Sequence, residues 1–173
     1  MSSEHTEGLF MRPGVPRSPT VTLLPEGPLP GAHEISGPYL GSDARGWTRS
    51  IAEHQNTTRS RFLDRPIDVV AGERTSRFVA AAMIAESTSL VTNLGSAGIG
   101  YINGDVTVGL VRLPVDEWIG TQADSHWAAD GIAVGTATLF DSHGPFGTGM
   151  VTAIANPVAQ IDFGNTPFGS PRL

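Results

Sequence analysis

A chain of 173 residues is long enough for one domain with an appendage, and 39% hydrophobic residues suffice for one core. The formal net charge of −6 argues against nucleic-acid binding, which needs clustered Lys and Arg to neutralise phosphates. The sequence contains no cysteine, which excludes disulfides and thiolate catalysis, and its five histidines lack metal-ligand spacing. We therefore expect no metal and no cofactor.

The chain begins without a basic segment followed by an apolar one, so it lacks the pattern of a secretory signal. No apolar run approaches the roughly 20 residues that a membrane span requires. These observations predict a soluble, cytoplasmic protein that makes no contact with membranes.

Three regions are predicted along the chain. Residues 1–45 form an extended arm rich in proline and glycine, because seven of the 13 prolines precede residue 40. Within this arm, TVTLL at 20–24 favours a short strand. The arm is either a disordered tail or a segment that lies across a partner. Residues 46–160 form the folded domain, and 161–173 form a C-terminal tail.

Two short strands are expected at the start of the domain, in TRSIAEHQ and in TTRSRFLDRPIDVV, joined as a hairpin. A helix is expected over about 75–93, where Phe78, Ala82, Ala85 and Ser89 share one face at helical spacing. This segment is apolar nearly all round, and Glu86 is its only acidic residue. We therefore expect the helix to be buried.

Four further strands are predicted in succession, at 105–113, 117–127, 131–140 and 148–155. Their connections are too short for parallel crossovers, so neighbouring strands must be antiparallel. Two strands, one buried helix and four antiparallel strands are the element order of a hot-dog fold. The predicted fold class is therefore α+β, a single hot-dog domain whose antiparallel sheet wraps one long helix.

Three stretches carry a family resemblance: YINGDVTVGLVRLP, VDEWIGTQADSHWAADGIAVGTATLFDSHGPFG and TGMVTAIANP. In this order and spacing, they resemble the second half of a double hot-dog acyl-CoA thioesterase of the TesB-like and actinobacterial thioesterase-like kind. The resemblance covers about residues 46–160. Enzymes of that family pack two hot-dogs side by side, which implies that this chain pairs with a homodimer mate or with a separate subunit.

The resemblance also implies catalytic residues, because the family holds its hydrolytic water with an Asp, a Ser or Thr, and a Gln. Carried over, the Asp falls on Asp105, seven residues before Arg112. The hydroxyl position falls on Ser125 or His126. The Gln position falls on Val151, whose side chain can neither donate nor accept a hydrogen bond. One of the three groups expected to hold the water is therefore missing.

Each of these residues also has a second interpretation. Asp105 is either the catalytic base or a turn residue after Asn103 and Gly104. His126 is either a proton relay to Asp105 or an exposed polar position on a strand. Ser125 and His126 have opposite strand parity, so only one of them can face the helix.

Arg112 is the candidate for substrate binding, as a contact for a phosphate of coenzyme A. The alternative is a surface ion pair with Asp116 or Glu117.

Three functions remain open from the sequence. The first is a dimeric acyl-CoA thioesterase that uses Asp105 with Ser125 or His126. The second is a non-catalytic hot-dog subunit that binds an acyl ligand or a partner protein, which Val151 favours. The third, a hydratase or dehydratase, needs a His/Asp pair near the helix, and no histidine lies between His54 and His126.

Overall fold

The computed structural model describes Leu24, Leu29 and residues 37–164. The strands of this part are β1 (Tyr39–Ser42), β2 (Gly46–Thr48), β3 (Ser60–Asp64), β4 (Tyr101–Leu110), β5 (Ile119–Ala129), β6 (Ile132–Asp141) and β7 (Gly144–Ala155). The helices are α1 (Arg77–Ala85) and α2 (Ser87–Asn93), with 3-10 turns η1 (Ile51–His54) and η2 (Pro157–Ala159).

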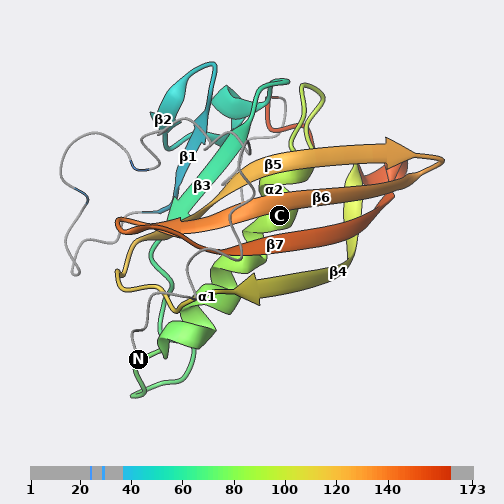
Figure 1. Ribbon diagram of the computed structural model, residues 1–173. Coiled ribbons are helices and arrows are strands. Elements are labelled where there is room, and N and C mark those ends of the chain that lie inside the picture. The colour runs from blue at the N-terminus through green and yellow to red at the C-terminus, as the bar shows by residue number, and fades with distance from the viewer. Residues whose placement is uncertain (1–23, 25–28, 30–36, 165–173) are drawn as a thin grey trace, which may run out of the picture.

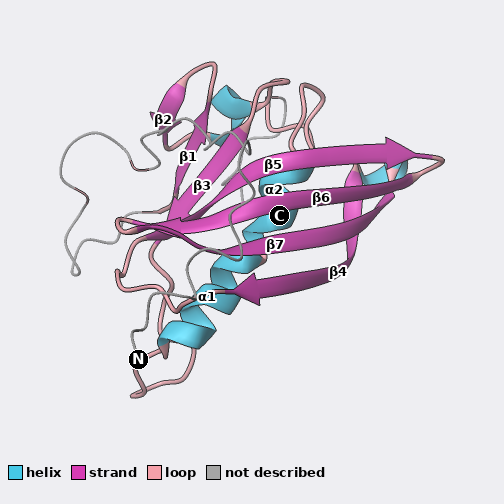
Figure 2. Ribbon diagram, viewed as in Figure 1, coloured by secondary structure: helices cyan, strands magenta, loops and turns pink. Residues whose placement is uncertain are grey.

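All seven strands belong to one antiparallel sheet in the order β2-β1-β3-β5-β6-β7-β4. The sheet curves around α1 and α2, which follow one another along its inner face (Figures 1 and 2). Glu86, which separates the two helices, itself has helical backbone angles of φ −59° and ψ −32°. The predicted hot-dog fold, a sheet wrapped around one long helix, is therefore confirmed.

The core lies between the helix and the central strands. It contains Ala81, Ile84, Ala85, Ile119, Leu139 and Phe146. Two sheet glycines let the helix approach the backbone directly. A Cβ on Gly135 would lie 2.5 Å from Thr92 Cβ, and one on Gly149 would lie 2.2 Å from Thr88 Oγ1. Larger residues at these positions would push the helix away from the sheet.

The predicted buried face of the helix is wrong in part. Ala85 is buried as expected, but Phe78 is 61% exposed and Ala82 is exposed as well. The helix instead turns Ala81 and Ile84 toward the sheet.

The first part of the domain also differs from the prediction. TRSIAEHQ was expected as a strand, but Ile51–His54 forms η1, and only Thr48 of this stretch belongs to a strand. The sheet begins at Tyr39, ahead of the boundary predicted at 46. Of the predicted strand at 20–24, all but Leu24 lies outside the described residues.

No helix among residues 37–164 is both long enough and apolar enough to pass through a lipid bilayer.

A buried histidine ties the N-terminal strands together. His54 is 0% exposed, its Nδ1 lies 2.9 Å from Ser42 Oγ of β1, and its Nε2 lies 2.8 Å from Thr48 Oγ1 of β2. Burial lowers the pKa of His54, an effect that Glu53 opposes and Arg45 reinforces. The native state therefore favours neutral His54.

This pKa shift predicts acid sensitivity. A group whose pKa is lowered by folding contributes stability above its unfolded pKa, here 6.5, and that stability is lost as pH falls through the lower folded pKa. We expect the free energy of unfolding, from urea titrations, to decline as pH falls below 6.5. His54→Gln should flatten this dependence, and an unchanged slope in that variant would contradict the assignment.

Candidate active site

Asp105 lies on the edge strand β4, directly after a register shift that begins at Asn103. It is exposed, and its Oδ1 accepts a hydrogen bond of 3.1 Å from the backbone N–H of Thr152. Thr152 alternates with the fully buried Val151 and Ala153, so it and Asp105 point away from the helix. Asp105 therefore faces the outer side of the sheet.

Ser125 and His126 lie on β5 and, as their parity requires, point to opposite faces. Ser125 Oγ lies 2.7 Å from Thr136 Oγ1 on the outer face. His126 pairs in register with Gly135, the glycine under the helix, and its ring contacts Tyr101 edge-on at 5.7 Å. His126 therefore lies on the inner side of the sheet.

The predicted site residues do not meet within one chain. Strands β7 and β6 separate β4 from β5, so Asp105 lies about 14 Å from the row of Ser125 and His126, or three inter-strand spacings. A single water cannot contact groups so far apart. Asp105 therefore cannot share a water with Ser125 or His126 of the same chain. That they share one in a dimer stays a prediction.

Arg112 bonds to the fold through both terminal nitrogens of its guanidinium. Its guanidinium donates two hydrogen bonds of 2.7 Å to the carboxylate of Asp141 and one of 2.9 Å to the carbonyl oxygen of Gly144. The predicted ion pair therefore exists, but its partner is Asp141 and not Asp116 or Glu117. The geometry gives no support to the predicted contact between Arg112 and a coenzyme A phosphate.

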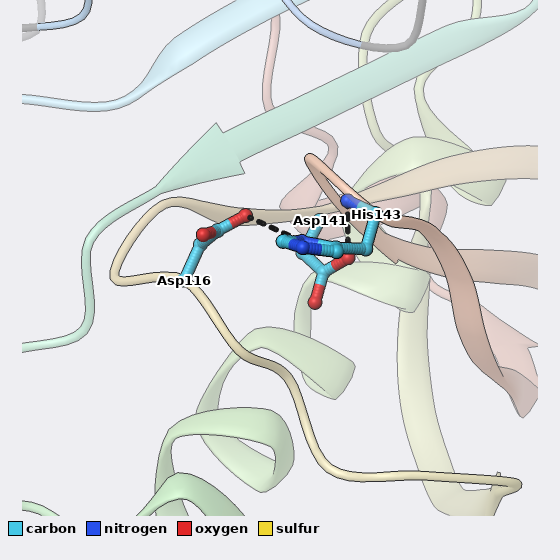
Figure 3. Close-up of side chains that lie close together, drawn as sticks. All are labelled: Asp116, Asp141 and His143. Atoms are coloured by element: carbon cyan, nitrogen blue, oxygen red, sulfur yellow. Dashed lines mark hydrogen bonds and ion pairs between the residues drawn. The ribbon is translucent and has the colours of Figure 1, made fainter.

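Asp116, Asp141 and His143 gather around the β6–β7 turn (Figure 3), and one oxygen or nitrogen of each lies within 4.8 Å of the others. Both oxygens of Asp141 already accept hydrogen bonds from Arg112, and the backbone N–H groups of Val115 and His143 add two more. A positive guanidinium at this position does not suit a metal cation. The cluster therefore fixes the loop before β5 to the turn after β6.

The protonation of Asp141 follows from these contacts. Burial by itself would raise the pKa of Asp141, but the hydrogen bonds from Arg112, Val115 and His143 outweigh it and lower that pKa. Asp141 thus stays ionised to low pH and holds Arg112 throughout the neutral range.

Removing this carboxylate should destabilise the fold. Asp141 is 1% exposed, and its loss leaves the guanidinium and two backbone N–H groups without their acceptor. We expect Asp141→Ala to lower the free energy of unfolding by about 3 kcal/mol, measured by denaturant titration. The matched control is Asp116→Ala, which removes a more exposed carboxylate of the same cluster and should cost clearly less. Equal losses in the two variants would contradict this structural role.

A second carboxylate occupies a different place on the inner side of the sheet. Glu86 separates α1 from α2, and its Oε1 accepts a hydrogen bond of 2.9 Å from Asn103 Nδ2 on β4. Ser89, one helical turn later, donates from its hydroxyl to Asn103 Oδ1. Helix and edge strand together therefore hold one carboxylate in a defined orientation.

Glu86, Ser89 and Asn103 line a cavity of about 560 Å³. Its wall also includes apolar side chains, namely Phe62, Met83, Ile84, Leu90 and Ile99. This volume is in the usual range of small-molecule sites, which combine apolar walls with a few placed polar groups.

Asp64, at the end of β3, lines the same cavity. Burial raises its pKa, while a hydrogen bond from the N–H of Arg65 and the charges of Arg49 and Arg65 oppose that effect. A carboxyl group with a raised pKa keeps its proton to higher pH than usual, so this cavity contains two carboxyl groups in different environments.

Sequence reasoning did not single out Glu86 or Asn103 as site residues. A signal was present, because Glu86 is the one acidic residue in an otherwise apolar helix. The spacing of the two residues carries no motif, since 17 residues separate them along the chain and only the packing of α2 against β4 joins them.

The structure thus combines a hot-dog domain with a polar group held beside an apolar cavity. The model of the acyl-CoA thioesterase C-terminal domain family matches residues 15–154 of this chain. The chain therefore belongs to that family. No curated protein matches it.

Several solved structures have a similar fold. One is a proposed thioesterase from Syntrophus aciditrophicus, with 14% identity and a TM-score of 0.46, covering 68% of this chain and 84% of that one. Others are a thioesterase from Haemophilus influenzae, with 14% identity, a TM-score of 0.44 and coverages of 58% and 73%, and zebrafish thioesterase superfamily member 2, with 12% identity, a TM-score of 0.43 and coverages of 58% and 77%. At these identities, family membership rests on the family model.

Proposed function

We propose that this protein is an acyl-CoA thioesterase that works as a dimer and uses Glu86 as its general base. The proposal is supported by membership of the acyl-CoA thioesterase family and, above all, by the placement of Glu86 at the cavity beside α2. The proposed reaction needs only water as its second substrate, and no cofactor.

The chemistry follows from the contacts of Glu86. Asn103 fixes Oε1, and the Glu86 side chain makes no other hydrogen bond within the described part of the chain, which leaves Oε2 available to a water. Glu86 takes a proton from that water as the oxygen adds to the thioester carbonyl carbon. The C–S bond then breaks, Glu86 returns its proton to the departing thiolate of coenzyme A, and the carboxylic acid product releases its own proton to solvent.

Asn103 has a second part in this mechanism. Its Nδ2 carries two N–H groups, of which one bonds Glu86. The other is available to donate to the thioester oxygen while negative charge develops there, as donors of an oxyanion hole do. A single hydrogen bond between helix and strand therefore positions both the general base, Glu86, and the oxyanion donor, Asn103.

Glu86 is favoured over Asp105 by its surroundings. Asp105 lies on the outer face of the sheet and accepts its hydrogen bond from the backbone of β7. This contact favours the turn interpretation of Asp105, in which its role is structural. A catalytic role for Asp105 stays a prediction. It requires a partner subunit that covers the outer face of the sheet.

Pairing with a second hot-dog is supported by the free edge of the sheet. Strand β4, ten residues long, has β7 on one side and no neighbour among the described residues on the other. Unpaired edges of this length favour pairing with another strand. On the helix, Phe78 is 61% and Val79 36% exposed. A two-fold-related copy at β4 would extend the sheet and bring two such helices alongside one another.

A non-catalytic subunit is the second candidate function. It is favoured by Val151, which occupies the family's glutamine position and is 0% exposed in the core. In that case the cavity beside α2 binds an acyl ligand without hydrolysing it.

Turnover of acyl-CoA thioesters decides between these candidates. Glu86→Gln keeps the shape of the side chain but removes the base, so we expect hydrolysis to fall by about 100-fold or more. Asp105→Asn is the matched control, an equally conservative change that should leave turnover close to that of the unchanged protein. The assay follows release of the free thiol over acyl chains of several lengths.

Two results would contradict the proposal. Loss of turnover in Asp105→Asn but not in Glu86→Gln would move the base to the outer face. Absence of turnover in the unchanged protein, with its circular dichroism and thermal unfolding normal, would favour the non-catalytic subunit.

The oligomeric state provides a separate prediction. Light scattering of the purified protein should give twice the 18.2 kDa of one chain. A mass of 18.2 kDa together with full turnover would contradict the need for a second hot-dog. The same mass without turnover would point to a separate partner subunit.

A further inference from the structure

A group of exposed apolar side chains lies on the outer face of the sheet, the face turned away from α1 and α2 (Figure 1). Strand pairing places Ile102 of β4 beside Ile154 of β7, and Ile154 beside Ile132 of β6. Ile154 follows the buried Ala153, so strand alternation directs this row of isoleucines outward. Trp127 of β5 lies one diagonal step from Ile132 on the same face.

The outer patch consists of Ile102, Trp127, Ile132 and Ile154. Trp127 is 67% exposed, and the three isoleucines are 46–55% exposed. Single exposed apolar side chains are common on protein surfaces, whereas adjacent ones mark sites of interaction. The hydrolysis proposed above makes no use of this surface.

Carboxylates surround the outer patch. Strands β4 to β7 contain no lysine and no arginine. Asp105 and Asp124 both lie on the outer face, where Thr138 Oγ1 donates a hydrogen bond of 2.8 Å to Asp124. Asp130 is exposed in the turn before β6. An occupant of this surface should therefore combine apolar groups with positive charge.

One segment of the N-terminal arm combines these two properties. Residues 8–24, GLFMRPGVPRSPTVTLL, contain Arg12, Arg17 and several large apolar residues, but no acidic residue. All of this segment except Leu24 lies outside the described residues. By its composition, the segment complements both the apolar character and the charge of the outer patch.

Prolines recur at every third position of this segment, as Pro13, Pro16 and Pro19. A polyproline II helix has three residues per turn, so these prolines would form one edge of such a helix. Proteins bind proline-rich segments of this kind on exposed aromatic side chains, and the preformed helix loses little entropy on binding. Trp127 offers an aromatic surface of that kind.

The chain is long enough to bring the segment to the outer patch. Tyr39, where β1 begins, pairs with Leu63, which pairs with Gly120 near the start of β5. Trp127 lies about 24 Å further along β5. Residues 20–36 can span up to about 55 Å when extended. The arm can therefore reach the patch of its own subunit.

We propose that residues 9–19 bind the outer patch of the same chain as a polyproline II segment whose prolines lie against Trp127. Arg12 and Arg17 then lie beside the surrounding aspartates. The bound segment shields apolar side chains that would otherwise favour non-specific association. This contact does not depend on whether the protein hydrolyses thioesters.

A spin label on the arm tests the contact in the full-length protein. The chain contains no cysteine, so Ser18→Cys provides a single thiol for a nitroxide. In the ¹⁵N-labelled, spin-labelled protein, the amide signals of Ile132 and Ile154 and the indole signal of Trp127 should lose most of their intensity. Reduction of the nitroxide with ascorbate should restore them.

Variants of the arm test the role of charge. Arg12→Glu combined with Arg17→Glu places carboxylates beside the aspartates, so the signals of the outer patch should keep their intensity although the spin label is present. Arg12→Lys combined with Arg17→Lys is the matched control, which keeps both charges and should keep the loss of intensity. Trp127→Ala, at an exposed position, should weaken the loss at the isoleucines.

Several results would overturn the proposal. Full intensity at the outer patch beside the spin label, or an equal loss in the Arg→Glu variant, would remove the contact or its basis in charge. Spin-labelled chains without ¹⁵N, mixed with unlabelled ¹⁵N chains and left to exchange subunits, test for an arm from the partner. A loss of intensity seen only in that mixture would assign the contact to the partner's arm. A fall in mass to that of one chain in Ile154→Glu would assign the outer patch to a second copy.

Discussion

The close approach of the helix to the sheet is the constraint on which the rest of this structure depends. Gly135 and Gly149 leave no room for a Cβ, and Thr92 and Thr88 occupy the space instead. This contact fixes the rotation of the helix about its axis. With that rotation set, Glu86 and Ser89 face the edge strand β4 and reach Asn103. The candidate site is therefore a consequence of how the core packs.

The middle and the C-terminal end of the helix have different chemical surroundings. Near its middle, Glu86 meets the amide of Asn103 beside an apolar cavity. At its C-terminal end, Asn93 lines a second cavity, and its Oδ1 is buried without a hydrogen-bond partner in the described part of the chain. Ser89 links the two because its hydroxyl accepts from Asn93 and donates to Asn103. The polar side chains of Glu86, Ser89 and Asn93 thus extend along the helix from one cavity to the other.

An ion pair fixes the sheet at the end of β4 that lies away from Asn103. Arg112 and Asp141 form a bidentate ion pair between the loop that leaves β4 and the turn between β6 and β7. Since β4 lies at the free edge of the sheet, this ion pair limits how far the strand can move from β7.

The sequence by itself determined the fold class, because helical periodicity, strand alternation and short turns are local properties, and short turns permit only antiparallel neighbours. It also placed Asp105 on the strand that follows the helix, and it carried the resemblance to the thioesterase family. Arg112 was expected in the same strand but lies in the loop after it. Only the tertiary structure decided which side chains meet. Strand order separates Asp105 from Ser125, and the sheet glycines set the helix rotation that exposes Phe78 and joins Glu86 to Asn103. Such contacts arise from packing between distant segments, which no local pattern encodes.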